Sequence, residues 1–150
     1  MINTQIIDKT EICRLIPHSG SMCLLDKVIE WDSKHIVCHT MTYQDLNNPL
    51  RSNGILPVVA LIEYGAQAMA VHGGLIAKDS DAAMQTGYLA SLRDVVLETG
   101  DISHVTTELC VEAIQLMSSQ GNMIYNFCVT ANKKSLVSGR ATVVAIFHDE

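Results

Sequence analysis

The chain has 150 residues and a net charge of −6, and its composition is 48% hydrophobic but only 17% charged. This length predicts one domain, residues 1–150, that is large enough to bury a core. The negative charge and the absence of a basic run argue against nucleic acid as a partner. So few charges indicate that much of the surface is weakly polar or is covered by another subunit.

The five cysteines are odd in number, irregular in spacing and free of any CxxC pattern. The sequence therefore predicts neither a disulfide framework nor a zinc site, and no other metal or cofactor is expected. The first residues carry neither the basic nor the apolar region of a signal peptide, which favours a cytoplasmic location.

The predicted elements begin with a short helix over residues 10–16, capped by Thr10. A hairpin of two strands follows, then a loop of turn-forming residues over 44–54, and then a long helix. After a polar break the chain alternates in long Thr- and Val-rich segments that are typical of strands. The predicted strands cover residues 23–31, 35–43, 84–98, 102–117, 122–131 and 135–147.

The long helix is predicted over residues 57–77, with Pro57 as its first helical residue. Apolar and small residues lie all round it, so we expect it to be buried on every side. Its length also suits a membrane span, but Glu63, Gln67 and His72 and the lack of flanking basic residues argue against one. The amphipathic strands need a core to cover, and this helix supplies it.

Strand segments separated from one long helix indicate an α+β fold with an antiparallel sheet. A single sheet that covers a helix apolar on all sides must curl around it. The sequence therefore predicts the hotdog arrangement, which usually dimerises.

Two stretches resemble the hotdog 3-hydroxyacyl-acyl-carrier-protein dehydratases, and most closely the divergent branch associated with aryl polyene biosynthesis clusters. They are LIPHSGSMCLLDKV, residues 15–28, and LPVVALIEYGAQAMAVHGG, residues 56–74. A later stretch, QTGYLASLRDVVL, also looks like that branch. The resemblance implies elimination of water from a 3-hydroxyacyl thioester to give a trans-2-enoyl thioester, in fatty acid or polyene biosynthesis.

The resemblance also assigns roles to single residues. Glu63 falls on the family's catalytic glutamate, and Gln67 falls on a glutamine that helps to fix the site. The family's histidine would fall on Pro49, and the loop over residues 45–55 contains no histidine. A glycine that the family uses after the helix-starting proline is Val58 here.

Dehydration needs a base for the α-proton, an acid for the leaving hydroxyl and a donor for the enolate oxygen. We expect Glu63 to be the acid and His18 to be the base or to orient the substrate. Amide groups of Val58 and Val59 at the helix start could bind the oxyanion, and Gln67 lies one turn from Glu63 on the same face. The alternative is that Glu63 is structural and that His18 is a turn residue bonded to nearby backbone.

The implied partner is an acyl carrier protein that carries the 3-hydroxyacyl chain, with either a homodimer or a heterodimer with another dehydratase subunit. A carrier protein is acidic, so basic residues near the motifs are docking candidates: Arg14, Arg51, Lys78 and Arg93. Two other functions remain open, a hotdog acyl thioesterase in which Glu63 activates water, and a catalytically weak subunit of an active dehydratase. The remaining histidines are assigned to core or surface positions: His72 to the core, and His35, His39, His104 and His148 to surface or packing roles.

Overall fold

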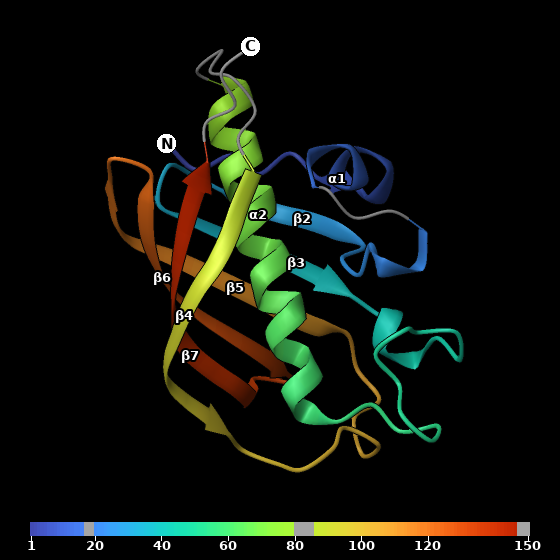
Figure 1. Cartoon of the computed structure of the whole chain (residues 1–150). Helices are drawn as coiled ribbons and strands as arrows, with labels where there is room; N and C mark the ends of the chain where they lie inside the picture. Colours follow the sequence, from blue (N-terminus) through green and yellow to red (C-terminus); the bar gives the residue numbers. More distant parts are fainter. Residues whose placement is uncertain (17–19, 80–85, 147–150) are drawn as a thin grey trace.

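A seven-stranded antiparallel sheet wraps around one long helix in the computed structural model, which describes residues 1–16, 20–79 and 86–146 (Figure 1). The strand order is β1-β2-β3-β5-β6-β7-β4. The predicted α+β hotdog fold is confirmed. The strands are β1 Ile7–Asp8, β2 Lys27–Trp31, β3 His35–Thr40, β4 Thr86–Leu97, β5 Leu109–Ser119, β6 Asn122–Ala131 and β7 Lys134–Ile146.

The long helix α2 spans Leu61–Asp79 and follows a 3-10 turn over Val58–Ala60. The prediction that Pro57 is the first helical residue is therefore wrong. Pro57 is the cap of the 3-10 turn, with an extended ψ of 151°. The following residue explains why, because the amide of Val58 donates a hydrogen bond to the carbonyl of Gly100 (3.1 Å) instead of facing into a helical turn.

Only one face of α2 is deeply buried in this chain. Tyr64, Ala68 and Val71 are fully enclosed against the sheet, whereas Ala70 and Gly73 on another face are partly exposed. The prediction of burial on every side is wrong for the single chain, because the small residues on that face leave a gap instead of filling it. Within the described residues, no helix is both long and apolar enough to cross a membrane.

Two local predictions are also corrected. The short helix α1, Lys9–Leu15, is capped by Asp8 and not by Thr10, because Asp8 Oδ1 accepts a hydrogen bond from the amide of Glu11 (3.0 Å). The predicted strand over 102–117 begins only at Leu109, and residues before it form turns. In those turns Ile102 is buried and its carbonyl accepts from the amide of Val105 (2.9 Å).

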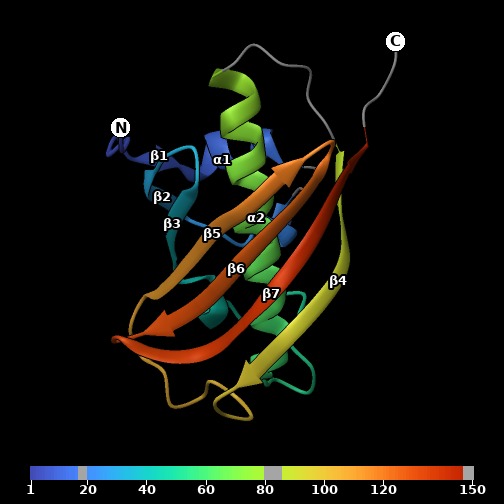
Figure 2. The ribbon, with the colours of Figure 1, turned by 90° about the vertical axis from the view of Figure 1, so that its left-hand side faces the viewer.

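Strand β4 lies at the end of the sheet opposite β1 and pairs with β7 (Figure 2). Among the described strands none pairs with its other edge. Residues 87–98 are all exposed, and many have large apolar side chains: Tyr88, Leu89, Leu92, Val95, Val96 and Leu97. A long apolar edge of this kind is a template for pairing with another strand.

Close packing of α2 on the sheet depends on two glycines around one aromatic ring. A Cβ added at Gly65 would lie 2.8 Å from Cδ2 of Phe127, and one added at Gly139 would lie 3.0 Å from the same ring. Phe127 is buried. The ring thus occupies the space that side chains at these two positions would need.

Candidate active site

The predicted acid, Glu63, lies in the first turn of α2 and is partly buried. Gln67, one turn later, is 1% exposed, and its Nε2 donates a hydrogen bond to Glu63 Oε1 (3.3 Å). The same Nε2 donates to the carbonyl of Met22 (2.7 Å), and Gln67 Oε1 accepts from the amide of Leu24 (3.0 Å). Since one end of the amide must accept and the other must donate, these contacts fix its orientation.

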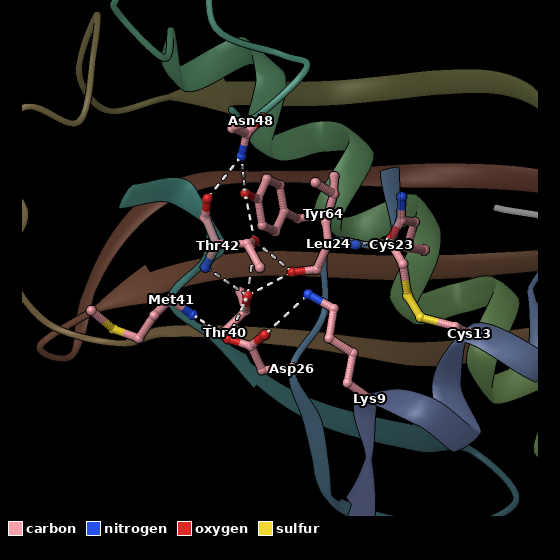
Figure 3. Close-up of polar contacts among 11 residues, drawn as sticks. Lys9, Cys13, Cys23, Leu24, Asp26, Thr40, Met41, Thr42, Asn48 and Tyr64 are labelled. Atoms are coloured by element: carbon pink, nitrogen blue, oxygen red, sulfur yellow. Dashed lines mark hydrogen bonds and ion pairs between the residues drawn. A yellow bond between two sulfur atoms is a disulfide. The ribbon is translucent and has the colours of Figure 1, made fainter. Parts of the chain in front are cut away.

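Gln67 therefore connects the carboxylate of Glu63 to the segment before β2. A disulfide between Cys13 and Cys23 attaches the same segment to α1 (Figure 3). The cysteine number and spacing predict no disulfide framework, and this bridge is a correction to that prediction. The sequence spacing gave no signal, since the pairing depends on a Cα–Cα distance of 6.0 Å that only the fold creates. The remaining cysteines are free: Cys38, Cys110 and Cys128.

A buried network of hydroxyl groups holds this segment from the other side (Figure 3). The carbonyl of Leu24 accepts hydrogen bonds from the hydroxyls of Thr40 and Thr42, both at 2.6 Å. The hydroxyl of Thr42 also meets that of Tyr64 on α2 (3.0 Å). Asn48 Nδ2 donates to the Tyr64 hydroxyl (2.9 Å). Every member of the network has a partner, as buried polar groups require.

The loop where the family carries its histidine is held by contacts of a structural kind. Beside Pro49, Asn48 donates to the carbonyl of Thr42 (3.0 Å) and accepts from the amide of Leu50 (2.9 Å). Arg51 donates to three backbone carbonyls at 2.8–2.9 Å, those of Asp45, Gly54 and Tyr43. Arg51 is thus bound within its own loop, which weakens it as a docking residue.

The other predicted site residues differ in whether the structure describes them and in whether their polar groups are already bonded. His18 lies outside the described residues, so its role stays a prediction. The amide of Val58 is already bonded to Gly100, and its side chain is buried. Val59, 52% exposed, is the remaining candidate for an oxyanion donor. Two docking candidates, Arg14 and Lys78, both approach Glu11 (3.5 and 2.8 Å).

A cavity of about 480 Å³ lies between α2 and the strands β4 to β7. Glu63 and Gln67 line it, and the small residues Ala66, Ala70 and Gly73 continue its wall along the helix. Met123 and Val143 line it from the sheet. Ligand sites typically have volumes of about 300–1,000 Å³ and mostly apolar walls with a few polar groups. The cavity thus combines an apolar channel with a carboxylate and an amide.

A polar chain runs from this cavity into the core. Gln115 Nε2 donates to the hydroxyl of Tyr125 (3.1 Å), which meets Nδ1 of His72 (2.8 Å). His72 Nε2 reaches the carbonyl of Asp32 (2.8 Å). Burial lowers the pKa of His72 and raises that of Tyr125 to about 12. His72 is thus the satisfied core histidine that the sequence predicted.

Two partly buried histidines on β3 pair with carboxylates. His39 Nδ1 lies 2.8 Å from Glu108, and His35 lies between Asp32 (2.9 Å) and Glu30 (3.2 Å). Partial burial lowers the pKa of His35, but its hydrogen bonds to the two carboxylates outweigh this and raise it. The bond from His35 holds the pKa of Asp32 at about 2. These contacts are consistent with the surface or packing roles expected for both histidines.

Sequence reasoning missed the contribution of the sheet to the cavity. Alternation along β5 puts Gln115 on the same face as Val111 and Ala113, both of which are buried. A glutamine at the end of such an apolar row was the available signal. Tyr125 gave none, because its register opposite Gln115 is a property of the folded sheet.

A model of the ApeP-like family, described as the ApeP dehydratase, matches residues 10–148. The chain therefore belongs to the ApeP-like dehydratase family. Over 77 residues it is 32% identical to the 3-hydroxyacyl-[acyl-carrier-protein] dehydratase FabZ of Francisella philomiragia. That match covers 48% of this chain and 47% of FabZ, so the chain spans about half the length of this curated relative.

Solved structures share the fold. The dehydratase heterocomplex ApeI:P from Xenorhabdus doucetiae contains a chain that superposes with a TM-score of 0.81 at 24% identity, covering 91% of both chains. A mutant thioesterase from Pseudomonas aeruginosa gives a TM-score of 0.65 at 11% identity, covering 95% of this chain and 96% of that one. At these identities the likeness establishes the fold alone.

Proposed function

We propose that this chain takes part in the dehydration of 3-hydroxyacyl thioesters carried by an acyl carrier protein, giving trans-2-enoyl thioesters. The observation that carries the proposal is the Glu63–Gln67 pair at an apolar cavity of about 480 Å³. An acyl chain fits a wall of small apolar side chains, and the carboxylate provides proton transfer next to it. Membership of a dehydratase family supports the same reaction.

In the proposed mechanism a base removes the α-proton, and the electron pair moves toward the thioester carbonyl as an enolate. The enolate then expels the 3-hydroxyl, which takes a proton from Glu63 and leaves as water. The Val59 amide would stabilise the enolate oxygen, because free N–H groups at a helix start bind negative charge. Gln67 fixes the Glu63 carboxylate through Nε2. We assign the base to His18 or to a partner subunit.

We further propose that the working unit is a dimer, joined at β4, with a second dehydratase-like chain or a second copy. The exposed apolar side chains of β4 and its unpaired outer edge among the described strands support this. Leu89 of β4 also lines the cavity, so a partner at this edge would lie beside the site. The loop around Pro49 contains no histidine, which favours a partner that brings its own.

The decisive experiment is mass spectrometry of a 3-hydroxyacyl carrier protein incubated with this chain alone and with a co-expressed second dehydratase chain. Loss of water from the carrier-bound chain supports the proposal. A free carrier thiol without dehydration would instead identify a thioesterase. No change in either incubation, with a folded protein, contradicts the proposal.

Location in the cytoplasm also stays a prediction. The Cys13–Cys23 disulfide counts against it, because reducing compartments keep most thiols reduced. Labelling of free thiols in freshly lysed, acid-quenched cells would decide the point. Five labelled cysteines agree with a reducing location, and three agree with an oxidising one.

A further inference from the structure

The wall of the cavity that belongs to the sheet carries a polar group far from Glu63. Gln115 on β5 and Tyr125 on β6 line the cavity, as Gly73 on α2 does. Tyr125 contacts His72, nine residues after Glu63, which places this group about 14 Å further along the helix axis. It therefore lies well beyond the atoms that react in the proposed function.

The positions of the hydrogens in the chain Gln115–Tyr125–His72 follow from the backbone carbonyl of Asp32 at its inner end. The carbonyl of Asp32 can only accept, so His72 Nε2 must carry the hydrogen of their 2.8 Å contact. Burial lowers the pKa of His72, so the ring is neutral at physiological pH and its Nδ1 accepts. Tyr125 keeps its proton, since burial raises its pKa to about 12, and donates it to Nδ1.

This sequence of donors decides which way the amide of Gln115 is turned. The hydroxyl of Tyr125 donates its only hydrogen to His72, so it must accept a hydrogen bond from Gln115 Nε2 (3.1 Å). The carbonyl oxygen Oε1 of Gln115 is then the end directed away from Tyr125. Within residues 1–16, 20–79 and 86–146, no group donates a hydrogen bond to this oxygen.

The backbone of Gln115 is fixed as well. Its amide donates to the carbonyl of Lys34 (2.7 Å), and the residue pairs with Tyr125 in the β5–β6 ladder. A bulge follows immediately, between Gln115 and Met117. Bulges re-aim side chains and are frequent beside active sites. Both the side chain and the backbone therefore hold Oε1 as a stationary acceptor in a mostly apolar cavity.

We propose that Gln115 is a specificity-determining residue whose Oε1 accepts a hydrogen bond from a hydroxyl group on the distal part of the bound acyl chain. This inference rests on the proposed function, because it assumes that an acyl chain occupies the cavity. It adds a requirement that the reaction itself does not impose, since any chain with a 3-hydroxyl could be dehydrated. Tyr125 and His72 are positioning residues that keep Gln115 in the accepting orientation.

The test uses unreactive acyl-pantetheine thioethers, which contain neither a thioester nor a 3-hydroxyl, in pairs that end in a methyl group or a primary hydroxyl. Several chain lengths are compared by calorimetry, with the isolated chain and with its complex. At the length that reaches Gln115, we expect the hydroxylated ligand to bind about tenfold more tightly, since one buried hydrogen bond contributes on that scale.

Variants separate this contact from general packing. Gln115→Met keeps the volume and removes the acceptor, so the preference should disappear through loss of affinity for the hydroxylated ligand alone. Tyr125→Phe frees the Gln115 amide to turn and should reduce the preference partly. Met117→Leu, on the same strand, is the matched control and should keep it. Thermal unfolding of each variant verifies that it is folded.

The outcomes distinguish this inference from the function on which it rests. If both ligands bind equally at every chain length, or if Gln115→Met retains the preference, Gln115 does not select the chain. If neither ligand binds at any length, the cavity is not an acyl site, and the proposed function fails together with this inference.

Discussion

At the scale of single residues, the orientation of one amide determines how the candidate acid is held. Gln67 uses its oxygen for the amide of Leu24 and its nitrogen for the carbonyl of Met22 and for Glu63. Glutamate at position 67 could not reproduce this pattern, because a carboxylate cannot donate. The carboxylate of Glu63 and the segment before β2 therefore depend on the same side chain.

We expect Glu63→Gln to lower dehydration by at least about 100-fold, the usual contribution of a general acid, while the melting temperature holds or rises. Turnover of a 3-hydroxyacyl carrier protein by the co-purified complex provides the measurement. Glu112→Gln on β5, outside the cavity, is the matched control and should retain activity. Unchanged turnover in Glu63→Gln would make the carboxylate structural and remove the acid from the mechanism.

The pKa values of two histidines should be shifted in opposite directions from the ordinary value. In an NMR pH titration we expect the imidazole of His35 to have a pKa above 6.5 and that of His72 one below 6.5. The His35 contribution to stability is complete below pH 6.5 and is lost as the pH rises through its folded pKa. The His72 contribution is present above pH 6.5 and is lost as the pH falls from there toward its folded pKa.

Asp32→Asn provides the control for this titration. It removes the Nδ1 partner of His35 and should lower the His35 pKa. The backbone carbonyl that binds His72 Nε2 is retained in this variant, so the His72 contact should persist. A His35 pKa that does not respond to the substitution would contradict the ion pair.

At the scale of elements, the disulfide should account for a measurable part of the stability. It joins residues ten positions apart, and closing a loop of that size restricts the unfolded chain by about 3 kcal/mol. Chemical denaturation with and without a dithiol reductant gives the value. The reductant should destabilise the wild type by about that amount and leave Cys13→Ser unaffected. Equal loss in both proteins would show that the reductant acts elsewhere.

Two glycine substitutions on α2 should have opposite effects. Gly65→Ala brings a methyl group against the ring of Phe127, and overpacking of this kind costs about 1–3 kcal/mol. At Gly73 an added Cβ meets nothing within 4 Å, so Gly73→Ala should stabilise the helix by up to about 1 kcal/mol. Thermal melts of both variants measure the difference. A stabilised Gly65→Ala would mean that Phe127 can move aside.

Most elements of the fold could be predicted from the sequence, because period-two alternation and turn residues persist through β3, β6 and β7. The turn that contains Ile102 has the apolar pattern of a strand, but Ile102 is buried and Val105 is partly buried there without strand pairing. Of the candidate site, Glu63 and Gln67 could be proposed in advance, because polar residues are conspicuous on an apolar helix. The disulfide and the Tyr125 contact could not, because both depend on distances across the fold.

At the scale of the whole molecule, the edge strand β4 predicts association. Leu92→Lys places a charge on this edge, and charged edge residues oppose strand pairing. Size-exclusion chromatography with light scattering should find a dimer for the wild type, or for its complex, and a shift toward monomer for the variant. Leu46→Lys is the control, because Leu46 is 87% exposed in a loop away from β4. A monomeric wild type at micromolar concentration, with no complex formed, would contradict the proposal that β4 pairs with another chain.

Arg51 has a consequence for proteolysis. Loops are where proteases usually cut, and trypsin requires an arginine or lysine side chain that can enter its specificity pocket. The guanidinium of Arg51 is instead bound by the carbonyls of Asp45, Gly54 and Tyr43. Cleavage after Arg51 therefore requires the loop to open first. The rate of this one cut reports how often the segment that carries Pro49 leaves the folded chain.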